Sequence, residues 1–404
     1  MTDGRAERRI LVSHTGNLPR PADLEALGND APAFTQRLPS AVSEVVQHQL
    51  DIGMDIVNDG EYVKRSGFGG YIRERLSGLE ARPGATRAQN TASSQWGPNR
   101  TGARDQNEFP GFHATHQNNS SVTGSFVRTP DGGGWAASAP GSLQVCTGAV
   151  TFIGHDAIRS DVETLLGAVA GKNVPGFLAS LGPGTLAASA VDEHYGNEEA
   201  FLFGMADAMH AEYQAIVDGG LLLQIDEPEL ARAYQFYPAM SLADYRDYTR
   251  LRVAAINRAL QGIPAERVRL HFCWGSGHRP HKNDVALGDI MDVILEANVG
   301  CFAFEASNGR HDWEWEVFRE LKLPPGKTIM PGVIGHASDI IEHPRLIAQR
   351  LVRYAELVGR ENVIAGTDCG LGTRVGHAEI AWAKLTSAAE GARIASQELW
   401  GRPA

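Results

Sequence analysis

Four side chains that suit a borderline-soft divalent cation stand at the ends of three short apolar runs. His271 and Cys273 end one run, Glu305 ends the next, and Cys369 ends a third. One imidazole, two thiolates and one carboxylate form a set that favours zinc. Residues i and i+2 of a strand point to the same side, so His271 and Cys273 can bind one ion.

The spacing of these ligands indicates a reaction centre. Structural zinc sites use closed, cysteine-rich sets at short spacing, whereas these three groups stand tens of residues apart. Alone, each would more often be a core thiol, a hydrogen-bonded histidine or a rim carboxylate. Together, each at the end of its own predicted strand, they indicate a closed parallel sheet, and an α/β barrel places its active site at that edge.

The ligand set also predicts the chemistry. Two thiolates and a carboxylate make the cation electron-rich and lower its Lewis acidity toward water. A free thiol with a pKa of about 8.5 is only slightly ionised at neutral pH, whereas a coordinating thiol loses its proton outright. We therefore expect Zn²⁺ to activate the sulfur of a small substrate thiol as a nucleophile.

Apolar runs alternate with amphipathic stretches, as in a parallel sheet with crossover helices. The predicted strand-like runs are 10–16, 55–61, 143–152, 176–184, 221–228, 267–275, 300–308, 327–335 and 362–370. The predicted helices are 40–50, 161–170, 197–218, 242–260, 287–297 and 344–358. We predict a single (β/α)8 TIM barrel over 1–404, with one of the nine runs outside it; the sequence leaves open which.

Residues 84–142 interrupt this pattern. The segment is rich in Gly, Asn, Ser, Thr and Pro and has no sustained periodicity, yet it holds more aromatic residues than a typical disordered linker. Loops of this length in compact domains are often functional. We predict an insertion that forms a lid or hairpin over the active-site face.

The composition excludes several classes of protein. The net charge of −11, without a sizeable Lys/Arg cluster, argues against nucleic acid or an anionic membrane as partner. The N-terminus lacks the apolar core expected of a signal peptide, and the longest apolar stretches have the length of a strand, which argues against a membrane span. Four cysteines form no disulfide framework, which predicts a cytoplasmic protein. We assign Cys146 and Cys301, which lack ligand-like neighbours, to packing.

The motifs resemble those of the cobalamin-independent methionine synthase family. H-F-C at 271–273, Glu305 and T-D-C-G at 367–370 are similar to its zinc ligands in order and spacing. The further matching motifs are T-G-N-L-P-R-P at 15–21, D-I-V-N-D-G-E at 55–61, L-Q-I-D-E-P at 223–228 and G-V-I-G-H at 332–336. The similarity runs from about residue 10 to 375 outside 84–142, and it implies the catalytic TIM barrel of a short member active in methionine biosynthesis.

The resemblance also implies roles for five residues. Glu61 and Asp226 would bind the amino group of a thiol such as homocysteine, and the backbone at Gly16 and Asn17 would hold its carboxylate. His336 would assist proton transfer to the leaving group, with Asp226 as a second catalytic residue. Each role is chemically sound, because strand-end carboxylates pair with ammonium, turn amides bind anions and histidine titrates near neutrality.

Two departures from the family pattern leave the methyl donor open. Asn17 stands where the family has Ser, and 181–189 lacks the tryptophan that stacks on the pterin. Trp96 or Trp135 of the insertion could replace that tryptophan. The donor could be of the 5-methyltetrahydrofolate type, a corrinoid or another carrier.

We therefore predict a zinc-dependent alkyltransferase, acting as a methyltransferase on a small thiol, with the thiol and an alkyl donor as its partners. The alternatives are a thiol–epoxide transferase or lyase on the same scaffold, a metal-free barrel similar to uroporphyrinogen decarboxylase, and a zinc-storing protein without turnover. The sequence leaves the oligomeric state open, including a homo-oligomer.

Overall fold

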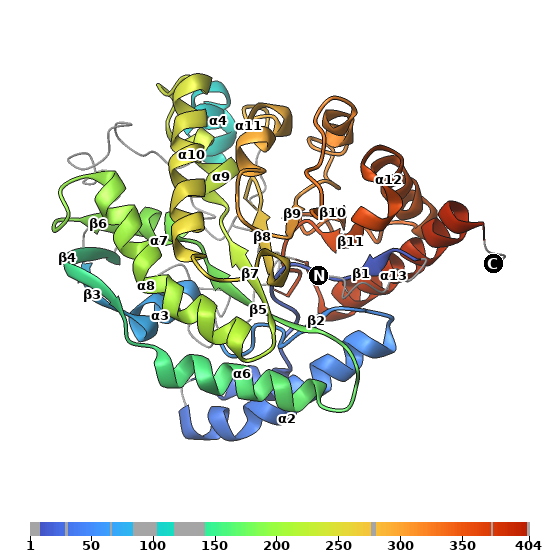
Figure 1. Cartoon of the computed structure of the whole chain (residues 1–404), viewed down its shortest axis with the longest axis horizontal. Helices are drawn as coiled ribbons and strands as arrows, with labels where there is room; N and C mark the ends of the chain where they lie inside the picture. Colours follow the sequence, from blue (N-terminus) through green and yellow to red (C-terminus); the bar gives the residue numbers. More distant parts are fainter. Residues whose placement is uncertain are drawn as a thin grey trace.

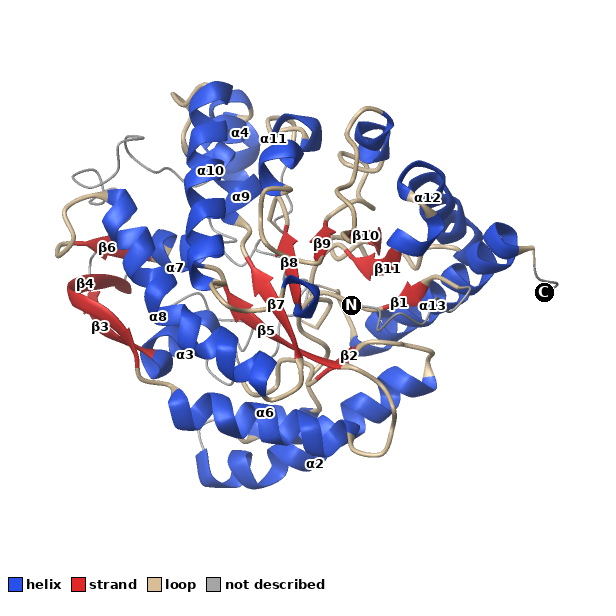
Figure 2. Cartoon of the chain, in the orientation of Figure 1, coloured by secondary structure: helices blue, strands red, loops and turns tan. Residues whose placement is uncertain are grey.

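A curled sheet of eight parallel strands forms the centre of the molecule, and helices surround it (Figures 1 and 2). The computed structural model describes residues 9–28, 31–64, 67–83, 103–116, 142–275, 280–372 and 375–401. In sheet order the strands are β1 (Leu11–Val12), β11 (Ile364–Thr367), β10 (Thr328–Ile334), β9 (Cys301–Phe304), β8 (Val268–Phe272), β7 (Leu222–Asp226), β5 (Gly176–Leu181) and β2 (Val57–Asn58).

The two edges of this sheet meet and close the barrel. The amides of Asp55 and Ile56, just before β2, donate to the Val12 carbonyl of β1 at 2.9 and 3.3 Å. Ser13 Oγ donates to the Ile56 carbonyl at 3.1 Å. The predicted TIM barrel is therefore confirmed.

Helices cover the outside of the barrel, and α2 and α6 lie together along one side of it (Figure 1). The longer helices are α2 (Ala31–Asp51), α6 (His155–Val169), α8 (Glu198–Asp218), α10 (Leu242–Ala259), α12 (Pro344–Val358) and α13 (Ala378–Trp400). The shorter ones are α1 (Ala22–Ala26), α3 (Gly67–Arg75), α7 (Pro183–Ala188), α9 (Glu229–Arg232) and α11 (Leu287–Ile294), with 3₁₀ turns η3 (Ala233–Phe236), η4 (Ala265–Arg267), η5 (Glu314–Arg319) and η6 (Arg360–Asn362).

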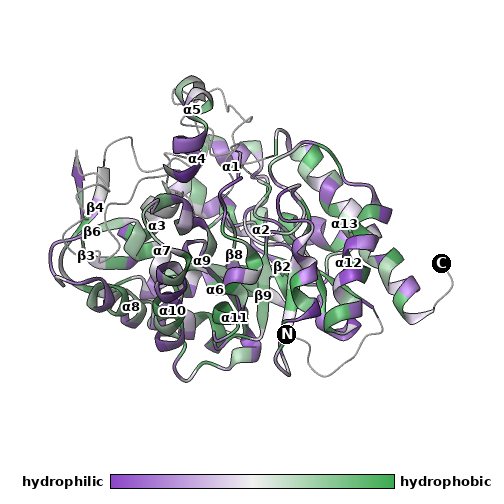
Figure 3. Ribbon diagram, turned by 90° about the horizontal axis from the view of Figure 1, so that it is seen from above, coloured by the Kyte–Doolittle hydropathy of each residue, from purple (hydrophilic) through white to green (hydrophobic). Residues whose placement is uncertain are grey.

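Apolar residues at helical spacing explain why these segments pack against the sheet. In α12, Ile347, Leu351 and Ala355 are buried on one face. Figure 3 shows hydrophilic and hydrophobic residues alternating along the outer helices. Each of the six predicted helices overlaps one of the observed helices.

Of the nine predicted strands, the run 143–152 is the one that lies outside the barrel. It is β4 (Ser142–Phe152), which pairs antiparallel with β3 (Leu76–Pro83) and parallel with β6 (Ala190–Asp192). β3 and β4 flank the insertion, so the chain enters and leaves that segment along neighbouring strands.

The described part of the insertion, 103–116, forms α4 (Ala103–Glu108) and α5 (Pro110–His116). Arg104 of α4 donates to the Tyr234 and Tyr237 carbonyls, in the loop that follows β7. This loop leaves the carboxyl end of its strand, which is the active-site face of a barrel. Trp96 and Trp135 lie outside the described residues.

The barrel interior combines an apolar core with one buried arginine. Cys301 is part of that core, as its assignment to packing predicts. Arg269 of β8 donates to Gln224 Oε1 at 2.8 Å and to the His14 carbonyl at 3.0 Å. Its guanidinium carbon lies 4.1 Å from the centroid of the Phe177 ring. These contacts offset the cost of burying the guanidinium.

His14 offers a pH test of this interior. Burial lowers the pKa of its ring from 6.5 to about 4, the charge of Arg269 also lowers it, and the hydrogen bond with Gln49 opposes the shift. Between these two pH values the unfolded chain binds a proton that the folded chain excludes, so stability falls as the pH drops through this window. Between pH 7 and pH 4.5, we expect the unfolding free energy of the unsubstituted protein to fall by about 2 kcal/mol more than that of His14→Asn. Urea denaturation at the two pH values measures the difference.

His155→Asn, which makes the same change at an exposed histidine, is measured over the same pH range as the matched control. Other buried groups titrate in both proteins, and their contributions cancel in the comparison. Equal pH dependence of His14→Asn and the unsubstituted protein would show that His14 is not buried in its neutral form.

Candidate active site

The structure brings three of the four predicted metal ligands together. A ring nitrogen of His271 and the sulfur atoms of Cys273 and Cys369 all lie within 4.8 Å of one another. His271 and Cys273 are buried, whereas Cys369 is half-buried. Ligands about 2.0–2.3 Å from one tetrahedral zinc ion lie about 3.5 Å apart, so these donors suit a single cation.

Glu305 lies in a neighbouring cluster. One of its carboxylate oxygens is within 4.8 Å of ligand atoms of His336 and Asp368. The Trp274 amide donates to Glu305 Oε2 at 2.9 Å, and Asn308 Nδ2 donates to Oε1 at 2.8 Å. Burial, together with the charge of Asp368, raises the pKa of Glu305 to about 7. The fourth predicted ligand is thus held beside the other three by its own hydrogen bonds.

The electrostatics of the two thiols also fit a cation. The hydrogen bond with Cys369 raises the pKa of Cys273 well above its ordinary value, and burial and the charges of Cys369 and Glu305 add to the rise. Each of these effects opposes a thiolate without a counter-charge. A divalent cation would supply that charge and release the proton.

Asp226 orients His271. Its Oδ1 lies 3.0 Å from His271 Nδ1 and accepts a hydrogen bond from Gln224 Nε2 at 2.7 Å. A carboxylate on one ring nitrogen fixes the direction of the other and increases its basicity as a ligand. Asp226, predicted as a substrate residue, therefore also acts on a predicted metal ligand.

Next to His271, Cys273 and Cys369, buried carboxylates outnumber positively charged side chains. Glu61 has a φ of 57°, which is uncommon for a residue other than glycine, and its Oε2 lies 3.5 Å from Lys64 Nζ. The pKa of Glu61 is raised to about 7, mainly by burial; the charge of Lys64 opposes the rise, and those of Asp226 and Asp59 add to it. Such a site favours a guest with a positive charge.

Gly16 and Asn17 lie against the loop that carries Cys369. Gly16 has a φ of 104°, and a Cβ there would meet the Gly370 backbone at 3.1 Å. Asn17 Oδ1 accepts a hydrogen bond from the Gly372 amide at 3.0 Å. The Asn17 side chain therefore fastens this loop, a role that the sequence did not indicate.

Asp368 joins the ends of β9 and β11. Its carboxylate accepts hydrogen bonds from the Ala306 amide at 2.8 Å, the Ser307 amide at 2.9 Å and Ser307 Oγ at 2.7 Å. His336, buried after β10, shares the cluster with Glu305 and Asp368. The sequence prediction gave Asp368 no role, although it directly precedes Cys369.

Lys64, Trp274 and Asn308 were also missed. Each follows a predicted site residue by three positions or fewer, and this proximity is the only signal in the sequence that could have found them. Among the described residues, no helix combines the length and apolar character that a membrane crossing requires.

Comparison with known sequences gives consistent matches. The family model described as "Cobalamin-independent synthase, Catalytic domain" matches residues 139–393, more than half of the chain. A methionine synthase from Thermococcus kodakarensis is 28% identical over 222 residues, which are 54% of this chain and 56% of that protein. One from Saccharolobus islandicus is 28% identical over 221 residues, 54% of this chain and 58% of that protein. The chain thus spans a little over half the length of these relatives.

Solved structures share the fold over nearly the whole chain. A B12-independent methionine synthase from a Shewanella species, in complex with selenomethionine, aligns with a TM-score of 0.67 and 20% identity, covering 97% of this chain and 99% of that one. A putative vitamin-B12 independent methionine synthase from Listeria monocytogenes aligns with a TM-score of 0.61 and 16% identity, covering 96% and 98%. At these identities the likeness shows the barrel fold.

Proposed function

This chain belongs to the family of cobalamin-independent synthase catalytic domains, and we propose that it is a zinc-dependent methyltransferase acting on the sulfur of a small amino-acid thiol such as homocysteine. The observation that supports this most strongly is the convergence of His271, Cys273 and Cys369 beside a group of buried carboxylates. The matched relatives are methionine synthases, which is consistent with this acceptor.

His271, Cys273 and Cys369 would hold the zinc ion, with Glu305 as the fourth ligand. When bound, the ion lowers the pKa of an incoming thiol so that the sulfur is ionised at neutral pH. Asp226 keeps the His271 ring in its binding orientation through the contact at Nδ1.

The acceptor would be positioned by its amino and carboxylate groups. Glu61 and Asp226 would bind the ammonium, whose charge would offset the excess of buried carboxylates. The backbone at Gly16 and Asn17 would hold the carboxylate. Fixing both groups aligns the sulfur with the donor carbon, and correct alignment is a large part of the catalysis of group transfer.

His336 would assist proton transfer to the leaving group of the donor. Its buried position next to Glu305 and Asp368 limits the access of water. The donor remains one of three kinds: a 5-methyltetrahydrofolate-type carrier, a corrinoid or another carrier. The segment where the family places its stacking tryptophan is here bonded to Glu227, which accepts hydrogen bonds from the Gly184 amide and Thr185 Oγ1, both at 2.7 Å.

X-ray absorption at the zinc edge tests the acceptor. We expect the zinc-loaded protein to gain a sulfur ligand when homocysteine is added. The matched control is 4-mercaptobutyrate, which lacks only the amino group and should require a concentration about 100-fold higher, because it cannot pair with the buried carboxylates. A protein that binds no zinc, or gains no sulfur ligand from either thiol, would contradict the proposal.

The thiol–epoxide transferase is the second candidate, because residues 181–189 contain no tryptophan for a pterin. Thiol consumption measured against a panel of methyl donors and a panel of epoxides separates the two reactions. A metal-free decarboxylase-like barrel would show no bound zinc, and a zinc store would show zinc without turnover on either panel.

A further inference from the structure

The described part of the insertion is docked on the barrel by buried polar contacts. Arg104 of α4 donates to three carbonyls, those of Tyr234, Tyr237 and Met240, at 2.8, 3.0 and 2.6 Å. Its guanidinium carbon also lies 3.7 Å from the centroid of the Tyr234 ring. One arginine therefore fixes α4 to the loop that follows β7.

Asp105 fixes α4 to the loop that follows β8. The residue is fully buried, and its Oδ1 accepts hydrogen bonds from the amide and Nδ2 of Asn283 at 3.1 and 3.0 Å. The amide of Asp105 donates to Gln235 Oε1 at 3.2 Å. The buried polar groups of α4 thus depend on partners in the barrel loops.

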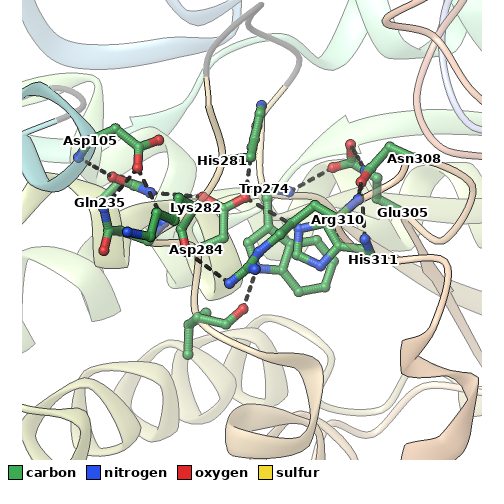
Figure 4. Close-up of polar contacts among 12 residues, drawn as sticks. Asp105, Gln235, Trp274, His281, Lys282, Asp284, Glu305, Asn308, Arg310 and His311 are labelled. Atoms are coloured by element: carbon green, nitrogen blue, oxygen red, sulfur yellow. Dashed lines mark hydrogen bonds and ion pairs between the residues drawn. The ribbon is translucent and has the colours of Figure 1, made fainter. Parts of the chain in front are cut away.

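Gln235 extends this contact to a second residue of the loop that follows β8. It is fully buried in η3, and its Nε2 donates to Asp284 Oδ1 at 2.9 Å. Asp284 Oδ2 lies 2.6 Å from His281 Nδ1 and 3.2 Å from His311 Nε2. Figure 4 shows these side chains in a continuous series between Asp105 and His311. One end of the Gln235 carboxamide therefore contacts the insertion and the other the barrel rim.

His311 is held between two carboxylates and stacks on Trp274. Its Nδ1 lies 2.7 Å from Glu314 Oε2, and its Nε2 contacts Asp284. Burial alone lowers the pKa of His311, but the hydrogen bonds with Asp284 and Glu314 raise it to about 9. The ring lies 3.9 Å from that of Trp274 at an interplanar angle of 22°, so a cation faces the indole.

Trp274 and Asn308 connect this stack to Glu305. The Trp274 amide and Asn308 Nδ2 donate to the two oxygens of Glu305 (Figure 4). Asn308 Oδ1 in turn accepts a hydrogen bond from the His311 amide at 3.1 Å. Both oxygens of the predicted fourth zinc ligand are therefore bonded to groups that His311 supports.

We propose that the docked α4 positions Glu305 for the metal site through the α4–Glu305 network, which consists of Asp105, Gln235, Asp284, His311, Trp274 and Glu305. The proposal rests on the proposed function, since it gives the insertion a role at the same zinc site. Undocking would leave the buried Gln235 and Asp284 with fewer partners, and the side chains would rearrange to recover them. The insertion is thus a positioning element as well as the expected lid.

Gln235→Leu tests the network, because leucine fills similar space but makes neither hydrogen bond. In the zinc-free protein we expect faster hydrogen exchange at the Trp274 amide, which donates to Glu305. In the cobalt-substituted protein we expect shifted visible absorption bands and about tenfold weaker cation binding, as is typical when a partner of a metal ligand is lost. Asp105→Leu should reproduce these effects from the other end of the network.

Two variants of α4 serve as controls. Asp105→Asn keeps the accepting Oδ1 and should restore both the exchange rate and the cobalt spectrum. Glu108→Ala removes the more exposed contacts with Lys282 and Asn283 and should leave both readouts unchanged. Thermal unfolding confirms that each variant is folded.

If Gln235→Leu and Asp105→Leu are folded and match the unsubstituted protein in both readouts, the proposal is wrong and α4 is merely docked. An unsubstituted protein that binds neither zinc nor cobalt would instead contradict the proposed function. The exchange experiment needs no cation, so it decides the network independently.

Discussion

Replacing Cys369 with serine is expected to abolish tight zinc binding and methyl transfer together. A hydroxyl is a much poorer ligand than a thiolate for a borderline-soft cation. If four ligands share about 10–16 kcal/mol of binding free energy, losing one weakens binding by about 100-fold or more. We expect less than about one hundredth of the activity, with zinc per chain measured after dialysis against a chelator.

Cys146→Ser is the matched control. Cys146 is a buried cysteine of β4, outside the barrel, and burial raises the pKa of its thiol to about 11. Replacing Cys146 should leave zinc content and activity intact, since β4 pairs with β3 in a separate sheet outside the barrel. A Cys369→Ser protein that kept both zinc and activity would overturn the assignment of the metal site.

The second large effect is expected from Asp226→Asn, which preserves shape and removes charge. The variant weakens the support of His271 and removes one partner of the acceptor ammonium. We expect kcat/KM for homocysteine to fall about 1000-fold, combining about tenfold for ligand orientation with about 100-fold for a lost buried charge partner. With 4-mercaptobutyrate, which has no ammonium, only the tenfold part should remain.

The difference between these two thiols makes the prediction specific. An equal loss of kcat/KM with both thiols would mean that Asp226 supports only the metal ligand. No loss with either thiol would show that Asp226 has no role at the site. Asp207→Asn, on α8 at an exposed ion pair with Arg258 of α10, controls for the loss of a carboxylate and should leave kcat/KM unchanged.

The insertion is connected to the barrel through β3 and β4. β3 and β4 bring its two ends together outside the barrel, so a long segment is added without disturbing the parallel strands. Only α4 and α5 of that segment are described, and α4 already contacts the loops after β7 and β8. The insertion therefore contacts loops at the carboxyl ends of two barrel strands.

Local patterns determined much of the fold from the sequence alone. A buried parallel strand is a short apolar run, and a polar residue marks its carboxyl end, so eight of the nine predicted runs form the barrel. The helix α13 was not among the predicted helices, although Ala381, Leu385 and Ala388 recur at helical spacing on its buried face. The apolar run that forms β4 has the same pattern as the other eight runs. The sequence of a single strand does not specify which strands it pairs with.

The sequence by itself placed the metal-ligating residue types at strand ends, because strand ends and residue chemistry are both local properties. Only the tertiary structure decided that Glu305 lies with His336 and Asp368, that Asn17 fastens Gly372, and that α4 reaches the rim. Each depends on hydrogen bonds between distant segments, such as Asp105 and Asn283, which lie 178 residues apart. The direction of such a bond is set by how the whole barrel closes, and no pattern within one segment contains that information.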